Sequence, residues 1–266
     1  MLKRFIPLAL AVAFAVPATL NAQESQGGEE RGQLIEVTTW NIDPSSNADW
    51  ETNVKKLVEA AQESEIPYRW AFWQKGSEYT LVYPVENFAY YDTPMQFMRS
   101  FSGKPGEAKM QEAMQAFETI EARVVIQELA EYKADWSYEV EGWTMDGTKA
   151  AHMDVMWLKP GSRESFESLT KDWTALVADL DYVYPVDGYE VHFGDVGRVV
   201  FVTFVDDLGS YYGENDMAKL VEEKGMGERM QKLIERLDQI TYRWDHYDMM
   251  FRPDLTYWPP EEGETE

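Results

Sequence analysis

The chain carries the same pattern of aromatic and polar positions twice. In residues 189–205, an aromatic-rich segment is followed by a glycine-containing turn and a second apolar segment. The acidic pair Asp206-Asp207 comes next, and Tyr211-Tyr212 follow it. Residues 68–83 show the same order, and Tyr90-Tyr91 follow them. Two short aromatic and β-branched runs separated by a turn are typical of a β-hairpin. The sequence therefore predicts an internal duplication built around two hairpins.

The amphipathic segments before the two hairpins are also copied. A strand is predicted at residues 34–42, and in the segment after it apolar residues recur at helical spacing. A second strand is predicted at 151–158, and a second segment of this kind follows it. The apolar positions correspond with an offset of 116 residues (166 minus 50, 173 minus 57, 177 minus 61): Trp50, Leu57 and Ala61 match Phe166, Trp173 and Val177. The duplication is therefore predicted to extend beyond the hairpins.

The segment after each hairpin is predicted to be helical, with a short strand after it. Residues 107–132 carry one apolar stripe, which consists of Met110, Met114, Phe117, Ile120 and Val124. A last strand is predicted at 135–140, and a matching strand at 254–257. Each half thus has the order strand, helix, strand, strand, helix, strand, and we expect the repeats to span residues 34–142 and 148–258.

This element order is that of the ferredoxin-like unit, so the predicted class is α+β. Two tandem copies resemble the dimeric α/β-barrel superfamily in a fused form, packed as an intrachain barrel. Its members include antibiotic-biosynthesis monooxygenase-like domains, stress-responsive barrel proteins and the haem-binding chlorite-dismutase group. The resemblance covers residues 34–258 and rests on element order. It implies a ligand in the barrel or between sheet and helices.

The ends of the chain differ in composition from the repeats. Residues 1–22 combine Lys3 and Arg4 with an apolar run, which predicts a signal peptide and a secreted or periplasmic protein. The apolar run is too short to span a membrane, so no span is expected in the mature form. Residues 23–33 are predicted to be a disordered linker, and 259–266 an acidic tail. Without cysteine, neither a disulfide nor a lipoprotein anchor is expected.

The charge limits the partners that the protein can bind. The chain has 24 basic and 48 acidic residues and a net charge of −24. Binding of nucleic acid or of an anionic membrane requires clustered Lys and Arg, so both are disfavoured. The acidic surface either keeps the protein soluble or attracts a cation or a basic partner.

Two of the three histidines are candidates for chemistry. His152 shares its predicted strand face with Asp154, and His192 alternates on another strand with Glu190 beside it on the same face. If these strands are neighbours, the residues form a general base or a small metal site. The alternative is a set of polar residues on a solvated or interfacial sheet face. We take His152, His192 and Asp154 as the catalytic candidates and predict no metal and no cofactor.

The family resemblance implies two further readings. His246 is predicted near the end of the last helix, where the haem-binding relatives suggest a haem ligand and the helix dipole alone would favour a histidine. The monooxygenase-like relatives use an Asn and a Trp without metal or flavin. Trp40 and Asn41 are adjacent on one strand here, so they point to opposite faces.

The aromatic residues provide the leading functional hypothesis. The candidates for lining an apolar ligand site are Trp40, Trp70, Phe72, Tyr83, Tyr189 and Phe193. The alternative is that these rings belong to the core. We expect a secreted protein that binds a small apolar or aromatic molecule in a barrel cavity. A cofactor-independent monooxygenase-like or haem-linked enzyme, and a non-catalytic interaction module, remain open, as does homo-oligomerisation.

Overall fold

The computed structural model of the protein describes residues 33–87 and 96–260. The predicted signal peptide, the linker up to residue 32, the Tyr90-Tyr91 pair and the tail from residue 261 lie outside the described residues. Within the described ranges, no helix combines the length and the apolar character that crossing a membrane requires.

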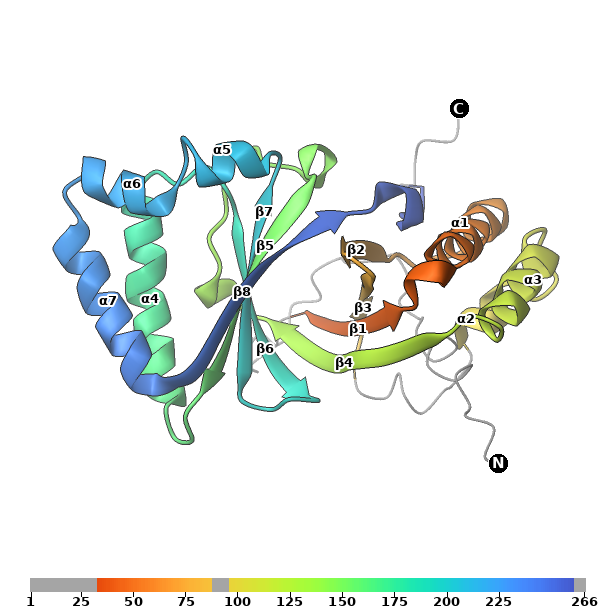
Figure 1. Cartoon of the computed structure of the whole chain (residues 1–266), viewed down its shortest axis with the longest axis horizontal. Coiled ribbons are helices and arrows are strands. Elements are labelled where there is room, and N and C mark those ends of the chain that lie inside the picture. Colours follow the sequence, from red (N-terminus) through yellow and green to blue (C-terminus); the bar gives the residue numbers. More distant parts are fainter. Residues whose placement is uncertain (1–32, 88–95, 261–266) are drawn as a thin grey trace, which may run out of the picture. The chain divides into compact units, whose positions relative to one another are not determined.

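The described residues form an α+β structure in which eight strands pair antiparallel. Figure 1 shows the course of the elements. The label η denotes a short 3₁₀ helix. The elements of the first half are β1 (Leu34–Ile42), η1 (Pro44–Ser46), α1 (Asn47–Ser64), β2 (Ala71–Lys75), β3 (Glu78–Val85), α2 (Gln96–Ser100), α3 (Glu107–Phe117), β4 (Ala122–Tyr132), η3 (Ala134–Trp136) and η4 (Met145–Gly147). Those of the second half are β5 (Ala150–Leu158), α4 (Arg163–Asp179), β6 (Val186–Phe193), β7 (Arg198–Val205), α5 (Leu208–Tyr212), α6 (Met217–Glu223), α7 (Gly227–Ile240), β8 (Thr241–Phe251) and η5 (Pro253–Leu255).

The chain forms two compact units. Of the described residues, one unit comprises 33–87, 96–127 and 252–260, and the other comprises 128–251. In the first unit, β3 pairs with both β1 and β2. In the second, β7 pairs with both β5 and β6, and β8 lies on the other side of β5. The same split βαββαβ order occurs twice, which supports the predicted duplication.

The helices of the second unit cover one face of its sheet. Figure 1 shows α4 and α7 side by side on that face. Phe166 of α4 is buried there against Trp136, with ring centroids 5.1 Å apart at 82°. Full burial of a large apolar side chain contributes about 1.5–3 kcal/mol. The predicted apolar face of this helix is therefore the face that forms the core.

The fourth strand of the first half replaces the end of a predicted helix. Helix α3 ends at Phe117, and β4 begins at Ala122, inside the range 107–132 that was expected to be one helix. The run Val124-Val125-Ile126 is β-branched, which disfavours a helix and favours a strand. The short strand expected at 135–140 is instead η3 followed by a single bridge between Tyr138 and Val186.

In the second half, too, a strand forms where the end of a helix is predicted. Helix α7 ends at Ile240, and β8 follows directly at Thr241, so His246 lies on a strand and not near a helix end. The aromatic and β-branched residues of this segment again favour the extended form. The strand expected at 254–257 is η5 plus one bridge between Trp70 and Tyr257.

Candidate acid–base site

Two short His-x-Asp sequences face each other across neighbouring strands of the second unit. One is His152-Met153-Asp154 on β5, and the other is His246-Tyr247-Asp248 on β8. In the antiparallel register, His152 lies opposite Asp248, and Asp154 lies opposite His246. Side chains two residues apart share a sheet face, so all four are on one face. The sheet register therefore places each histidine against a carboxylate.

His152 is held in one orientation by its neighbours. Its Nδ1 is 2.9 Å from Oδ1 of Asp248, and the residue is only 7% exposed. A carboxylate can only accept, so in the neutral imidazole the proton that meets Asp248 is on Nδ1, and Nε2 then carries the lone pair. An imidazole oriented in this way by a carboxylate can act as a general base at Nε2.

Tyr212, which lies on helix α5, donates a hydrogen bond to Asp248. Asp207 caps α5, and its side chain accepts from the backbone N–H of Ser210 at 2.6 Å. The Tyr212 hydroxyl at the end of this helix donates to the Asp248 oxygens at 2.9 and 3.0 Å and is 3.1 Å from Nδ1 of His152. Burial and then the Asp248 hydrogen bond raise the pKa of Tyr212 to about 12. Tyr212 therefore remains a neutral donor.

Asp154 lies on the other side of the His152 ring. Its Oδ2 is 3.7 Å from Nε2 of His152, which is too long for a direct hydrogen bond. Its Oδ1 accepts from Nε1 of Trp244 at 2.9 Å. Burial raises the pKa of Asp154 above its ordinary value, and the electrostatic effect of the neighbouring His152 and the hydrogen bond from Trp244 partly oppose this shift. The imidazole of His152 and a carboxyl group with a raised pKa, that of Asp154, thus face each other at 3.7 Å. We call His152, Asp154, Tyr212, Asp248 and Trp244 the His152 cluster.

Aromatic rings adjoin the His152 cluster. The Tyr211 ring centroid is 5.1 Å from that of His152, and Tyr211 also packs on Tyr184 at 5.8 Å. Tyr211 shares a hydrogen bond with Tyr182, and burial raises the pKa of both phenols. The surroundings are therefore aromatic, with hydroxyl groups that stay protonated.

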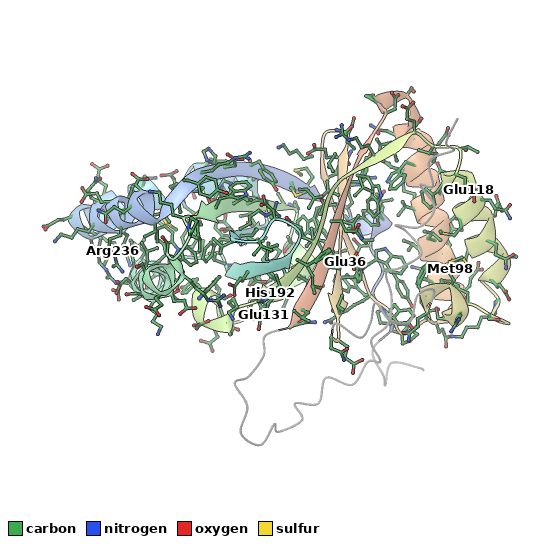
Figure 2. All side chains as sticks on the ribbon, turned by 90° about the horizontal axis from the view of Figure 1, so that it is seen from below. Glu36, Met98, Glu118, Glu131, His192 and Arg236 are labelled. Carbon is green, nitrogen blue, oxygen red and sulfur yellow. The ribbon has the colours of Figure 1, made fainter. Side chains whose placement is uncertain are left out.

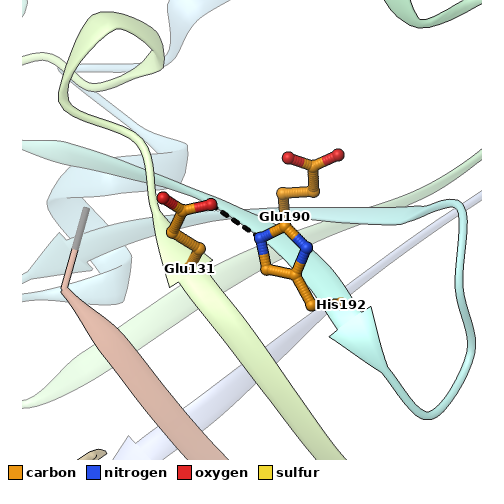
Figure 3. Close-up of side chains that lie close together, drawn as sticks. All are labelled: Glu131, Glu190 and His192. Atoms are coloured by element: carbon orange, nitrogen blue, oxygen red, sulfur yellow. Dashed lines mark hydrogen bonds and ion pairs between the residues drawn. The ribbon is translucent and has the colours of Figure 1, made fainter. Parts of the chain in front are cut away.

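The other catalytic candidate lies elsewhere in the second unit. The expectation that the strands of His152 and His192 are neighbours is wrong, because β7 separates β5 from β6. His192 instead meets Glu131 of β4, with Nε2 2.6 Å from Oε2, and Glu190 lies beside them (Figure 3). The structure thus joins His152 to Asp154 and places His192 in a separate group.

The aromatic ligand candidates of the first unit are buried among other rings. Trp40 is 2% exposed and packs on Trp50 and Phe72, with centroids 5.5 and 6.5 Å apart. Trp70 donates from Nε1 to the backbone oxygen of Leu255 at 2.9 Å. Tyr83 is 1% exposed. These positions match the core alternative, and a ligand role for them stays a prediction.

The two candidates of the second unit differ in exposure. Tyr189 is half-buried, packs on Tyr132 at 5.7 Å and donates to Oδ2 of Asp187 at 3.0 Å. Phe193 is 65% exposed. Asn41 is exposed and its neighbour Trp40 is buried, as expected for adjacent residues of a strand. Trp40 and Asn41 therefore do not form one site.

The first unit has no copy of the His152 cluster at the matching position. Glu36 of β1 lies 116 residues before His152 (152 minus 36) and is 1% exposed (Figure 2). It accepts from Nε2 of Gln127 at 3.3 Å and from the Thr38 hydroxyl at 3.4 Å. The duplication therefore repeats a buried polar position, but the imidazole is present only in the second unit.

Sequence reasoning missed Asp248, Tyr212 and Trp244 as site residues. Asp248 was missed because its segment was assigned to a helix, in which i and i+2 positions do not share a face. A usable signal was present, since His-x-Asp occurs twice and alternation on paired strands would bring the two copies together.

No family model matches the sequence, and no curated protein matches it. Among solved structures, an anthrone oxidase-like protein matches with a TM-score of 0.55 and 12% identity, over 89% of this chain and 96% of that chain. A putative monooxygenase from Fusobacterium nucleatum matches with a TM-score of 0.54 and 9% identity, over 84% of this chain and 94% of that chain. Matches at this identity show the fold alone. In fold, the chain is similar to these two proteins, in line with the fold that the sequence resemblance implied.

Proposed function

We propose that the His152 cluster is an acid–base site that binds a small aromatic molecule and removes a proton from it. The observation that carries the proposal is the contact between Nδ1 of His152 and Asp248, which leaves Nε2 as the basic atom. Buried, carboxylate-oriented imidazoles are effective general bases near neutral pH.

The proposed step needs only side chains of this chain. Nε2 of His152 accepts a proton from a hydroxyl or an acidic C–H group of the ligand, and the electron pair stays on the ligand as a phenolate or enolate. Asp154 lies 3.7 Å from Nε2, and its raised pKa brings it closer to the range in which a carboxyl group can exchange protons. Asp248 balances the charge of the imidazolium that forms.

The aromatic class of ligand follows from the surroundings of His152. Tyr211 and Tyr212 present rings within 5.1 and 6.0 Å of the His152 ring centroid. Trp244 is 44% exposed beside Asp154, so it can also contact a ligand. Aromatic rings favour other rings in tilted or stacked arrangements, each contributing about 0.5–1.5 kcal/mol.

A monooxygenase-type reaction is the natural continuation of this step. One structural neighbour is described as anthrone oxidase-like. For anthrone, loss of a proton gives an electron-rich anion, and dioxygen then oxidises it to anthraquinone with release of one water. We therefore propose dioxygen as co-substrate and no bound cofactor.

Oxygen consumption by the mature chain with anthrone tests the proposal. We expect His152→Gln to lower the anthrone-dependent rate by about 100-fold or more, because general base catalysis typically contributes that much. Tyr242→Ala is the matched control, since Tyr242 is 64% exposed on the same strand as Asp248. No anthrone-dependent oxygen uptake by the wild type, or an equal rate in His152→Gln, contradicts the proposal.

Several finer expectations remain predictions beside this one. They are the closure of the strands into one intrachain barrel, a cavity lined by the six aromatic candidates, a haem ligand at His246, and export after a signal peptide. The repeat boundaries at 34–142 and 148–258 and homo-oligomerisation are also predictions. Mass spectrometry of the exported chain tests the cleavage site before Gln23, and a Soret band with added haem tests the haem reading.

A further inference from the structure

Three side chains of types that can ligate a metal ion lie close together on β6 and on the part of β4 that belongs to the second unit, and they share no residue with the His152 cluster. Glu131 of β4 lies directly opposite Glu190 of β6, and His192 is two residues further along β6 (Figure 3). One ligand atom of each residue lies within 4.8 Å of the others. We call Glu131, Glu190 and His192 the His192 cluster.

A β-bulge places His192 in this group. Leu129 pairs with Phe193 and Ala130 pairs with Val191, so His192 is an extra residue on β6 with no partner position on β4. Bulges of this kind turn a side chain away from its regular direction and are common beside functional sites. Here the imidazole Nε2 reaches Oε2 of Glu131 at 2.6 Å (Figures 2 and 3).

The ligand atoms are close to the spacing that a metal ion needs. Zinc binds imidazole nitrogen and carboxylate oxygen at about 2.0–2.2 Å, so its tetrahedral ligands lie roughly 3.4 Å apart. The His192–Glu131 contact would open slightly, and Glu190 would move inward. The side chains of Glu131 and Glu190 are each 14% exposed, and that of His192 is 32% exposed. An ion can therefore enter from solvent and keep a water ligand.

The carboxylates of Glu131 and Glu190 are in contact with two positively charged side chains. Arg163 binds Glu190 through both of its terminal nitrogens, and Nζ of Lys133 is 3.5 Å from Glu131 and 4.0 Å from Glu190. Carboxylates directly opposite each other on paired strands repel unless a cation lies between them. The Arg163 side chain is 54% exposed, so it can leave Glu190 for water without a large penalty.

We propose that the His192 cluster binds a divalent first-row transition ion such as Zn²⁺, with Arg163 as the group that the ion displaces. Imidazole with two carboxylates suits Zn²⁺ better than Ca²⁺ or Mg²⁺, which prefer oxygen ligands throughout. The net charge of −24 raises the local concentration of cations around the protein. This inference is independent of the proposed acid–base function, because the two clusters share no residue.

Calorimetric titration of the mature, metal-free chain with Zn²⁺ tests the proposal. We expect one site per chain, with affinity lowered about tenfold or more in His192→Ala and in Glu131→Gln. His246→Ala is the control, since His246 is an exposed histidine of the same unit that lies outside the cluster. Equal affinity in His192→Ala and the wild type overturns the proposal.

Arg163→Gln distinguishes a built site from an adventitious surface histidine. Removing the competing cation is expected to tighten Zn²⁺ binding several-fold, whereas binding to a single imidazole would not respond to Arg163. Unchanged or weaker binding in Arg163→Gln overturns the proposal. As a second readout, Zn²⁺ should raise the melting temperature of the wild type more than that of His192→Ala at the same Zn²⁺ concentration.

Discussion

His152 on β5 lies directly opposite Asp248 on β8, and its Nδ1 is 2.9 Å from the Asp248 carboxylate. Both side chains project from paired strands, so the backbone hydrogen bonds of the sheet fix their separation. Sites built on regular elements hold their geometry better than sites on loops. Tyr212, which donates to the same carboxylate, is the component that comes from a short helix.

Asp248→Asn is expected to lower the proposed anthrone oxidation by about 100-fold or more while leaving the fold intact. An amide can donate to Nδ1, which favours the tautomer with the proton on Nε2 and removes the basic atom. Oxygen uptake across a range of anthrone concentrations measures the effect on kcat. A variant that keeps the wild-type kcat would show that Asp248 does not set the His152 tautomer.

Arg252 stabilises the first unit through a polar network. Its guanidinium donates to both Glu51 oxygens at 2.7 and 2.8 Å and to both Asp254 oxygens at 2.9 Å. We expect Arg252→Met to lower the free energy of unfolding by about 1–3 kcal/mol, mainly because the half-buried carboxylate of Glu51 loses its charge-assisted hydrogen bonds, while the more exposed Asp254 contributes less. Urea unfolding of the wild type and of Arg252→Met measures this difference in the free energy of unfolding. Arg229→Met is the control, since this exposed pair with Asp179 should contribute less than about 1 kcal/mol.

The same network predicts a loss of stability in acid. Hydrogen bonds from Arg252 are the main cause of lowered pKa values at Asp254 and Glu51. A carboxyl group whose folded pKa is depressed stabilises the fold above its ordinary pKa, and this contribution is lost as the pH falls towards the folded value. Thermal unfolding should therefore show a steep fall in melting temperature below about pH 4 in the wild type. A fall of equal steepness in Arg252→Met would exclude the network as its source.

Asp187 should have the opposite pH dependence. Burial raises its pKa from 3.8 to about 6, with a smaller opposing effect from the Tyr189 hydrogen bond. Between these values the folded state holds the extra proton, so this group makes the protein less stable as the pH rises from 3.8 to about 6. Asp187→Asn should unfold at a higher urea concentration than the wild type at pH 7, by up to about 3 kcal/mol, with little difference at pH 3. An equal or lower midpoint at pH 7 contradicts this.

Gly188 allows β6 to approach η3. A Cβ at this position would lie 2.7 Å from Cβ of Trp136 and 3.2 Å from the Phe201 ring. Gly188→Ala is therefore expected to cost about 1–3 kcal/mol of stability through overpacking. Gly147→Ala is the matched control, because a Cβ there meets no atom within 4 Å. The expectation fails if the two variants have the same melting temperature.

The repeated pattern of apolar positions was sufficient to predict the fold class and the duplication. The apolar positions that include Phe166 and Val177 predicted the buried face of α4, and the hairpins of both halves lie where alternation placed them. The pattern did not separate α3 from β4, because Ile120 and Val124 continue the helical spacing by chance. Backbone pairing with another strand, which local sequence does not reveal, decides the form of such segments.

The candidate site could be predicted only in part for the same reason. His152 and Asp154 are two residues apart on one strand, so alternation alone placed them together. Asp248 lies 96 residues from His152. Its position depends on the register between β5 and β8, and a shift by one residue would turn it to the other face. Tyr212 depends in addition on the path of α5, for which the sequence offers only the Asp207 cap.

Nitrogen-15 NMR of the histidine rings tests the central claim most directly, because the chain has only three histidines to assign. Spectra of the mature protein recorded without and with anthrone under anaerobic conditions report the tautomer of His152 and the gain of a proton at Nε2. We predict a neutral ring with its proton on Nδ1 in the free protein, and an imidazolium when anthrone is bound. A free ring with its proton on Nε2, or a His152 signal that anthrone leaves unchanged, would contradict the assignment of His152 as the base.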